Sequence, residues 1–178
     1  MNLRERFEDY RESIRFGDLD SASRAMAMLW LGIFRGRVVR NCFPRVESES
    51  LIAEMSEIIN SIFLEGYILA RAADNLGAGR VTFTEPERPA SVEEGVEKLR
   101  VMYEEEAVEN IPFAGEPLGV ESLAEGLVRE ITYSPRMMRL EKRELLKVHL
   151  IYALWAGYKL ARFERKLTAA RGYQPFGF

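Results

Sequence analysis

The sequence predicts an all-α protein: a helical bundle with a long central C-terminal helix and a basic N-terminal helical arm. The first observation is that residues 148–161 are apolar on nearly every side, with only His149 and Lys159 strongly polar. Such a helix is surrounded by other helices or by lipid, and 14 residues are too few to span a bilayer. The second observation is helical spacing of apolar residues elsewhere, without evident strand pairing.

The N-terminal arm is expected to cover residues 1–46 and to contain two helices. The first, over 2–16, carries one apolar stripe on a charged helix and should end at Gly17. The stripe consists of Leu3, Phe7, Tyr10 and Ile14. The second, over 20–40, has an apolar middle and a basic end. The arm is therefore basic from residue 21 onward.

The bundle is expected to cover residues 47–171. Helices are predicted over 47–76, 91–110 and 120–133, each with apolar residues at helical spacing, and a last helix over 135–171. Ser91 and Glu94 have the spacing of a capping box, and Ser134 before Pro135 is typical of a helix start. Residues 172–178 form an aromatic tail. The tail residues Tyr173, Phe176 and Phe178 are expected to anchor in a groove of a neighbouring subunit.

The net charge of −3 conceals four blocks of charge. Residues 21–46 carry +5 and residues 136–178 carry +7, whereas residues 47–90 carry −5 and residues 91–135 carry −8. Like charges grouped in this way repel one another, so each block should meet an opposite block or an outside partner. Two interpretations stay open: basic and acidic helices are neighbours within the protein, or a basic block faces a polyanion.

The remaining composition bears on disulfides, the cellular compartment and the source of the protein. One cysteine, Cys42, excludes an internal disulfide and a cysteine-rich zinc site. The N-terminal residues carry no apolar signal region, so a cytoplasmic protein, or a particle assembled in the cytoplasm, is expected. High charge and few amides, with a single glutamine, are typical of a heat-adapted protein, and we expect a hyperthermophilic source. A GC-rich genome is an alternative explanation for twenty arginines against five lysines.

Catalytic chemistry is weakly supported. His149 is the only histidine, and it is best interpreted as a hydrogen-bonded core or interface residue. Cys42 is interpreted as a small buried apolar residue. Two pairs of glutamates lie one helical turn apart, a spacing that can hold Mg²⁺. The pairs are Glu54 with Glu57, and Glu106 with Glu109. They are similar to the acidic pairs of the all-α nucleotide pyrophosphatases, but the second pair has a different pattern and lies much later. Solvated helix faces explain these acids better, so we expect no catalytic residue, metal or cofactor.

The arginines of the arm are the strongest functional signal. They are Arg24, Arg35, Arg37, Arg40 and Arg45. Arginine makes bidentate contacts with phosphate, and several such contacts give nucleic-acid binding that depends on salt and not on base sequence. Trp30 and Phe34 lie among them, and their spacing favours a place in the core. Pairing of the arginines with the acidic residues between 47 and 130 is an equal alternative.

The layout over the whole chain resembles the major capsid proteins of filamentous viruses of hyperthermophilic archaea. The resemblance implies a virion subunit that self-assembles, alone or with a paralogue, and neutralises the phosphates of double-stranded DNA. It would place the five arm arginines on phosphates, with Arg136, Arg139 and Arg143 as an alternative surface. The sequence departs from it in its acidic first helix and negative net charge. A second hypothesis is a small helical interaction subunit of an RNA-guided defence complex, and a third is the Mg²⁺-dependent nucleotide pyrophosphatase.

Overall fold

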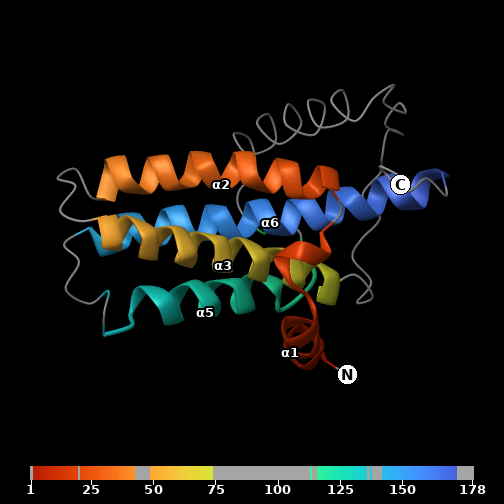
Figure 1. The fold of residues 1–178 in the computed structure, drawn as a ribbon. Coiled ribbons are helices and arrows are strands. Elements are labelled where there is room, and N and C mark those ends of the chain that lie inside the picture. Colours follow the sequence, from red (N-terminus) through yellow and green to blue (C-terminus); the bar gives the residue numbers. More distant parts are fainter. Residues whose placement is uncertain are drawn as a thin grey trace.

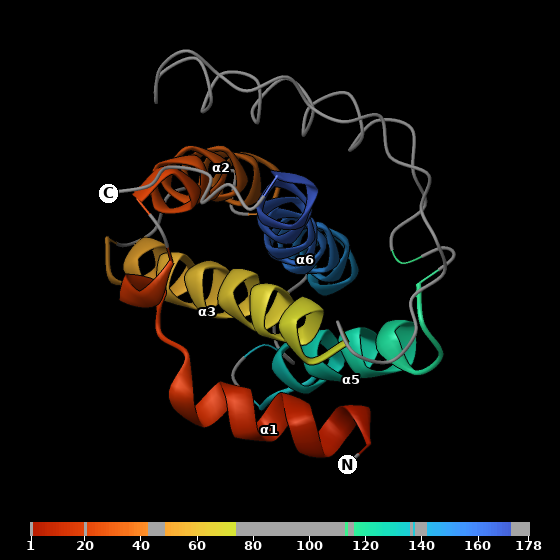
Figure 2. The ribbon, with the colours of Figure 1, turned by 90° about the vertical axis from the view of Figure 1, so that its right-hand side faces the viewer.

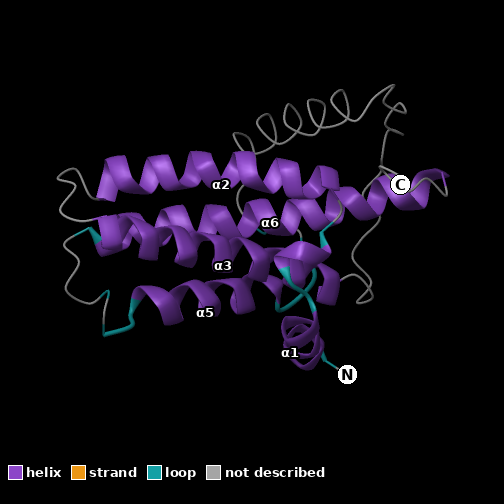
Figure 3. Cartoon of the chain, in the orientation of Figure 1, coloured by secondary structure: helices purple, strands orange, loops and turns teal. Residues whose placement is uncertain are grey.

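The computed structural model describes residues 2–19, 21–42, 49–73, 113, 116–135, 137 and 142–171. The described part contains five α-helices and one 3-10 turn (Figure 1). The helices are α1 (Leu3–Ser13), α2 (Ser21–Cys42), α3 (Glu49–Ala73), α5 (Val120–Thr132) and α6 (Arg143–Arg171), and the turn spans Phe16–Asp18. No strand occurs among these residues, so the predicted all-α class is confirmed (Figure 3).

Helix α6 packs against α2, α3 and α5, and Figure 2 shows it between α2 and α5. Its most extensive contact is with α3. The buried side chains of these helices belong to one apolar core. Among the largest fully buried side chains on α3 and α6 are Ile59, Ile62, Phe63, Leu146, Leu150 and Tyr158.

Two glycines allow α3 and α6 to approach closely. A Cβ atom added to Gly66 would overlap the carbonyl oxygen of Leu154, and one added to Gly157 would overlap the carbonyl oxygen of Phe63. The backbones therefore touch where any larger residue would hold them apart. We call this contact the α3–α6 seam.

Helix α1 runs crosswise to the other helices and packs on α3, below which it lies in Figure 2. It begins with a capping box, in which Asn2 Oδ1 accepts from the Glu5 amide at 3.0 Å and Glu5 Oε2 accepts from the Asn2 amide at 2.9 Å. Phe7 is fully buried, as the predicted stripe requires. Arg11 donates to Glu65 Oε1 of α3 at 2.6 Å. Burial nevertheless raises the pKa of Glu65, and Arg11 opposes that rise.

Two predicted helix boundaries are wrong. The first helix ends at Ser13 and not at Gly17, because Ile14 is extended and Asp18 accepts from the Arg15 amide at 2.6 Å. The last helix begins at Arg143 and not at Pro135. Ser134 begins a turn, in which its carbonyl accepts from the Met137 amide at 3.0 Å, and this turn places Met137 in the core.

Several predictions lie outside the described residues. These are the helix over 91–110, the boundaries near 46 and 172, and the tail with Tyr173, Phe176 and Phe178. Within the described ranges, no helix is long and apolar enough to cross a membrane.

Candidate nucleic-acid interface

Four of the five predicted arginines lie on α2, and Arg45 falls outside the described residues. Arg24, Arg37 and Arg40 are exposed, and Arg35 is half-buried. Within the described ranges, none of the four has a carboxylate at ion-pair distance. Arg35 instead donates from Nε to the Leu31 carbonyl at 3.2 Å. The described residues therefore do not include an acidic partner for these cations.

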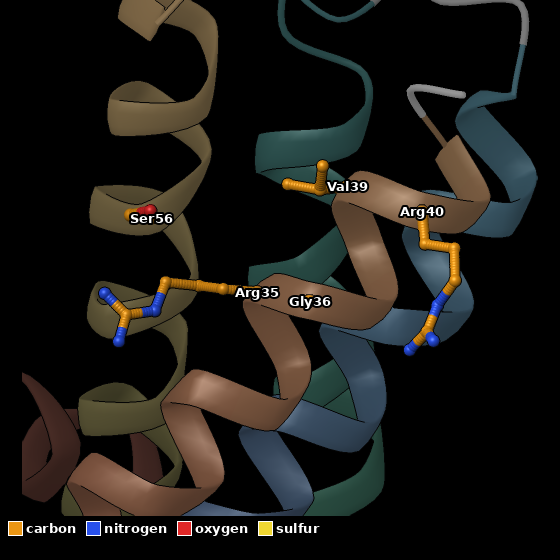
Figure 4. Close-up of a pocket in the computed structure, with 5 residues that line it drawn as sticks. All are labelled: Arg35, Gly36, Val39, Arg40 and Ser56. Atoms are coloured by element: carbon orange, nitrogen blue, oxygen red, sulfur yellow. The ribbon is translucent and has the colours of Figure 1, made fainter. Parts of the chain in front are cut away.

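The arginines do not form a single row. A shallow, open hollow on the surface is lined by Arg35, Gly36, Val39, Arg40 and Ser56 (Figure 4). In that view Arg35 extends toward α3, where Ser56 lies, whereas Arg40 extends to the opposite side of α2. Because a helix turns by 100° per residue, Arg24 falls beside Arg35, and Arg37 falls nearer to Arg40. Arg24 and Arg35 therefore lie along one edge of α2, and Arg37 and Arg40 along the other.

The edge with Arg37 and Arg40 meets the start of α6. Asn41 Nδ2 lies 3.3 Å from His149 Nε2, and Lys142 Nζ donates to the Asn41 carbonyl at 3.1 Å. Two basic blocks that are far apart in the sequence therefore come together here. We call the group of Arg37, Arg40, Lys142 and His149 the basic end.

His149 is half-buried at this junction. Burial lowers its pKa, and the nearby positive charge of Arg37 lowers it further. The neutral imidazole is thus favoured while no anion is near, and an anion at the basic end would favour the charged form. His149 has the hydrogen-bonded place that the sequence suggested.

Cys42 and the two aromatic residues of α2 also behave as predicted. Cys42 is buried, and burial raises the pKa of its thiol while Lys142 opposes the rise. Trp30 and Phe34 are both buried, with ring centroids 5.8 Å apart. Neither ring is available for stacking on a base.

The alternative arginine surface is only partly described. Arg136 and Arg139 fall outside the described residues. The Arg143 guanidinium lies over the ring of Tyr133, 4.7 Å from its centroid, and 3.7 Å from a carboxylate oxygen of Glu144. Arg143 therefore lies over Tyr133 at the end of α5 and beside Glu144, its neighbour on α6.

Only the first of the two acidic pairs lies within the described residues, and its two glutamates differ in exposure. Glu57 is exposed, Glu54 is partly buried, and Glu106 and Glu109 lie outside the described residues. Across the described ranges, no group of three or more histidine, cysteine, aspartate or glutamate side chains is placed to hold a metal ion.

Two carboxylates that the sequence analysis did not single out join the helices internally. Glu116 accepts from the Tyr158 hydroxyl at 2.6 Å and also pairs with Arg162. Burial raises the pKa of Tyr158, and its hydrogen bond to Glu116 raises it further. Glu164 accepts from Ser23 at 2.5 Å and from the Tyr67 hydroxyl at 2.7 Å. The signal for both was a tyrosine within an apolar helix, because a buried hydroxyl needs a partner.

Comparisons of the chain with protein-family models, with curated proteins and with solved structures find no match.

Proposed function

We propose that this chain is a structural, non-enzymatic subunit that packages nucleic acid, and that its basic end contacts the phosphates of double-stranded DNA. The observation that carries the proposal is the meeting of α2 and α6 at Asn41. That contact brings the exposed side chains of Arg37, Arg40 and Lys142 to one end of the protein. A cluster of cations drawn from two elements suits a polyanion better than any single helix would.

The mechanism is charge neutralisation. Each cation that contacts a phosphate releases condensed counterions, so binding is strong at low salt and indifferent to base sequence. In this proposal the helices around α6 form a bundle that holds the cations in fixed positions. Many copies assemble around the DNA, alone or with a paralogue, and the tail residues Tyr173, Phe176 and Phe178 join neighbouring copies into a filamentous virion of a hyperthermophilic host.

The first test measures DNA affinity as a function of salt. Fluorescence anisotropy with a labelled duplex should show a strong loss of affinity as salt rises. Replacing Arg37 and Arg40 with alanine should reduce the slope of log K against log salt by about 0.9 for each lost phosphate contact. The matched control replaces Arg4 and Arg71, which are exposed arginines on α1 and α3. An affinity independent of salt, or an equal loss in the control, would contradict the proposal.

Electron microscopy tests the assembly separately. Filaments that form with DNA at low salt and dissociate at high salt are expected for a packaging subunit. If the protein binds DNA with the expected salt slope but remains a discrete particle, the packaging mechanism fails while the phosphate contacts stand.

A second candidate is a small helical interaction subunit of a nucleic-acid-binding complex. The observation that favours it is the apolar outward side of α2, where Met28 and Leu29 are exposed by 57% and 48%. Such a subunit needs larger partner proteins and forms no regular filament by itself. The same microscopy separates the two candidates, because only the packaging subunit assembles with DNA alone.

A further inference from the structure

The outward side of α2 carries an apolar surface without a described partner. Met28, Leu29 and Ile33 are exposed by 57%, 48% and 39%, and Gly32 and Gly36 lie between them at helical spacing. A Cβ atom added to either glycine would meet nothing within 4 Å. We call these five residues the outer strip. Large side chains of this kind gathered on one side of a helix mark a surface for another apolar element.

The apolar surface extends beyond α2. Helix α6 packs beside α2 and exposes Leu145, Val148 and Tyr152 by 38%, 47% and 37%. An element that covers the outer strip can therefore also reach the outward side of α6.

The positive charge of α2 favours an acidic segment as the element that covers the outer strip. Helix α2 has four arginines and no acid, so a second copy of α2 would bring like charges together. An acidic amphipathic helix fits instead. Residues 91–110 carry seven acids and two bases, and Val92, Val96, Leu99 and Tyr103 recur at helical spacing. This segment lies outside the described residues, so its helix is an expectation from the sequence.

The chain is tied to α6 at Phe113, three residues beyond the end of this segment. Ser23 near the start of α2 and Tyr67 on α3 both donate to Glu164, and beyond Tyr67 the end of α3 runs away from α2 toward α5 (Figure 2). The chain returns at Phe113, whose ring lies 4.7 Å from Trp155 and 5.4 Å from Tyr158 on α6. One end of the intervening chain is thus held on α6, which packs beside α2, and this tether raises the effective concentration of the segment there.

We propose that the outer strip of α2 is the docking site of residues 91–110 of the same chain. The apolar side of the segment covers the strip, and its acids lie beside Arg24 and Arg35 at the α3 edge of α2. The two glycines permit close approach of the two helix backbones. The proposal rests on the outer strip, Arg24 and Arg35 and not on DNA binding, although Arg40 lies two turns after Ile33 on the same side of α2.

Disulfide cross-linking in the full chain tests the docking. In a Cys42→Ala background, Leu29→Cys is combined in turn with Val96→Cys, Leu99→Cys or Tyr103→Cys. At least one pair should oxidise within a monomer on the order of tenfold faster than the matched pair with Val101→Cys, because tethering raises the effective concentration only for a facing residue. Val101 is the same residue type as Val96 and lies on the opposite side of the predicted helix.

Charge reversal provides the second measurement. Arg24→Glu with Arg35→Glu should slow the cross-link several-fold, as repulsion replaces attraction, whereas Arg4→Glu with Arg71→Glu should leave the rate unchanged. Equal rates for all pairs and the Val101 control would overturn the proposal. Cross-links found mainly between two chains would also overturn it, because the occupant would then come from a second copy. Neither result depends on DNA.

Discussion

Two pairs of helix glycines occupy opposite environments in this protein. Gly66 and Gly157 lie in the α3–α6 seam, where the neighbouring backbone fills the space of a missing Cβ. Gly32 and Gly36 lie on the outer strip, where the same space is open. A glycine inside a helix costs about 1 kcal/mol relative to alanine. At the seam, close packing offsets that cost, whereas no described side chain offsets it at the strip. Gly126 on α5 is equally open, so what distinguishes the strip is the exposure of Met28, Leu29 and Ile33 beside its glycines.

The largest effect is expected at the seam. Gly66→Ala and Gly157→Ala should each lower the free energy of unfolding by about 3 kcal/mol or more, because a rigid backbone carbonyl must move to admit the methyl group. Urea denaturation monitored by circular dichroism measures this loss. Gly126→Ala on α5 is the control, since nothing lies within 4 Å of that position. Equal stability of the seam variants and the control would show that the two helices are not in close contact.

A smaller effect distinguishes a covered strip from an open one. On an open helix surface, Gly32→Ala and Gly36→Ala would raise the free energy of unfolding by up to about 1 kcal/mol, as is expected at Gly126. A segment seated closely on the strip removes this gain, so we expect no stabilisation at Gly32 or Gly36. Urea denaturation of Gly32→Ala and Gly36→Ala measures whether the free energy of unfolding rises. A gain equal to that of Gly126→Ala would mean that the strip faces solvent.

The smallest effect is expected at His149, which lies between the covered core and the open surface. The pKa of His149 in the folded protein is lower than the ordinary histidine value of 6.5, so the unfolded chain binds a proton first as the pH falls. Stability is therefore complete above pH 6.5 and decreases as the pH falls toward the pKa of the folded state. His149→Gln should flatten that dependence in thermal denaturation across this range.

The same imidazole also reports on the basic end. The chain contains one histidine, so its NMR titration needs no assignment. Phosphates placed beside Arg37 and Lys142 should raise the pKa of His149 when duplex DNA is added. An unchanged titration in the presence of bound DNA would place the DNA elsewhere on the protein.

The apolar periodicity of the sequence was sufficient to predict the all-α class and most helix positions. The stripe around Phe7 and the apolar stretch 148–161 were visible because burial recurs at helical spacing. The start of α6 was not predictable in this way. Ser134 and Pro135 have the local chemistry of a helix start, but the burial of Met137 favours a turn. Tertiary packing decided between two locally acceptable conformations.

The candidate site was predicted by residue type and not by geometry. Clustering identified Arg35, Arg37 and Arg40, but the sequence could not show that Arg35 and Arg40 extend to opposite sides of α2. Nor could it show that Lys142 and His149 meet Asn41, because that contact joins residues about a hundred positions apart. The seam glycines were missed for the same reason, since a glycine within a helix carries no mark of the backbone that it will face.

The aromatic cluster at the return of the chain has an optical consequence. Phe113 meets Trp155 edge-on, and Trp155 and Tyr158 are stacked with centroids 5.5 Å apart. Rings held in one fixed arrangement give near-ultraviolet circular dichroism, which disappears when side-chain packing is lost even if helices remain. Phe113 is the residue at which the chain rejoins α6 after its excursion from α3. The near-ultraviolet spectrum therefore reports whether Phe113 is packed against Trp155 and Tyr158, without any label on the protein.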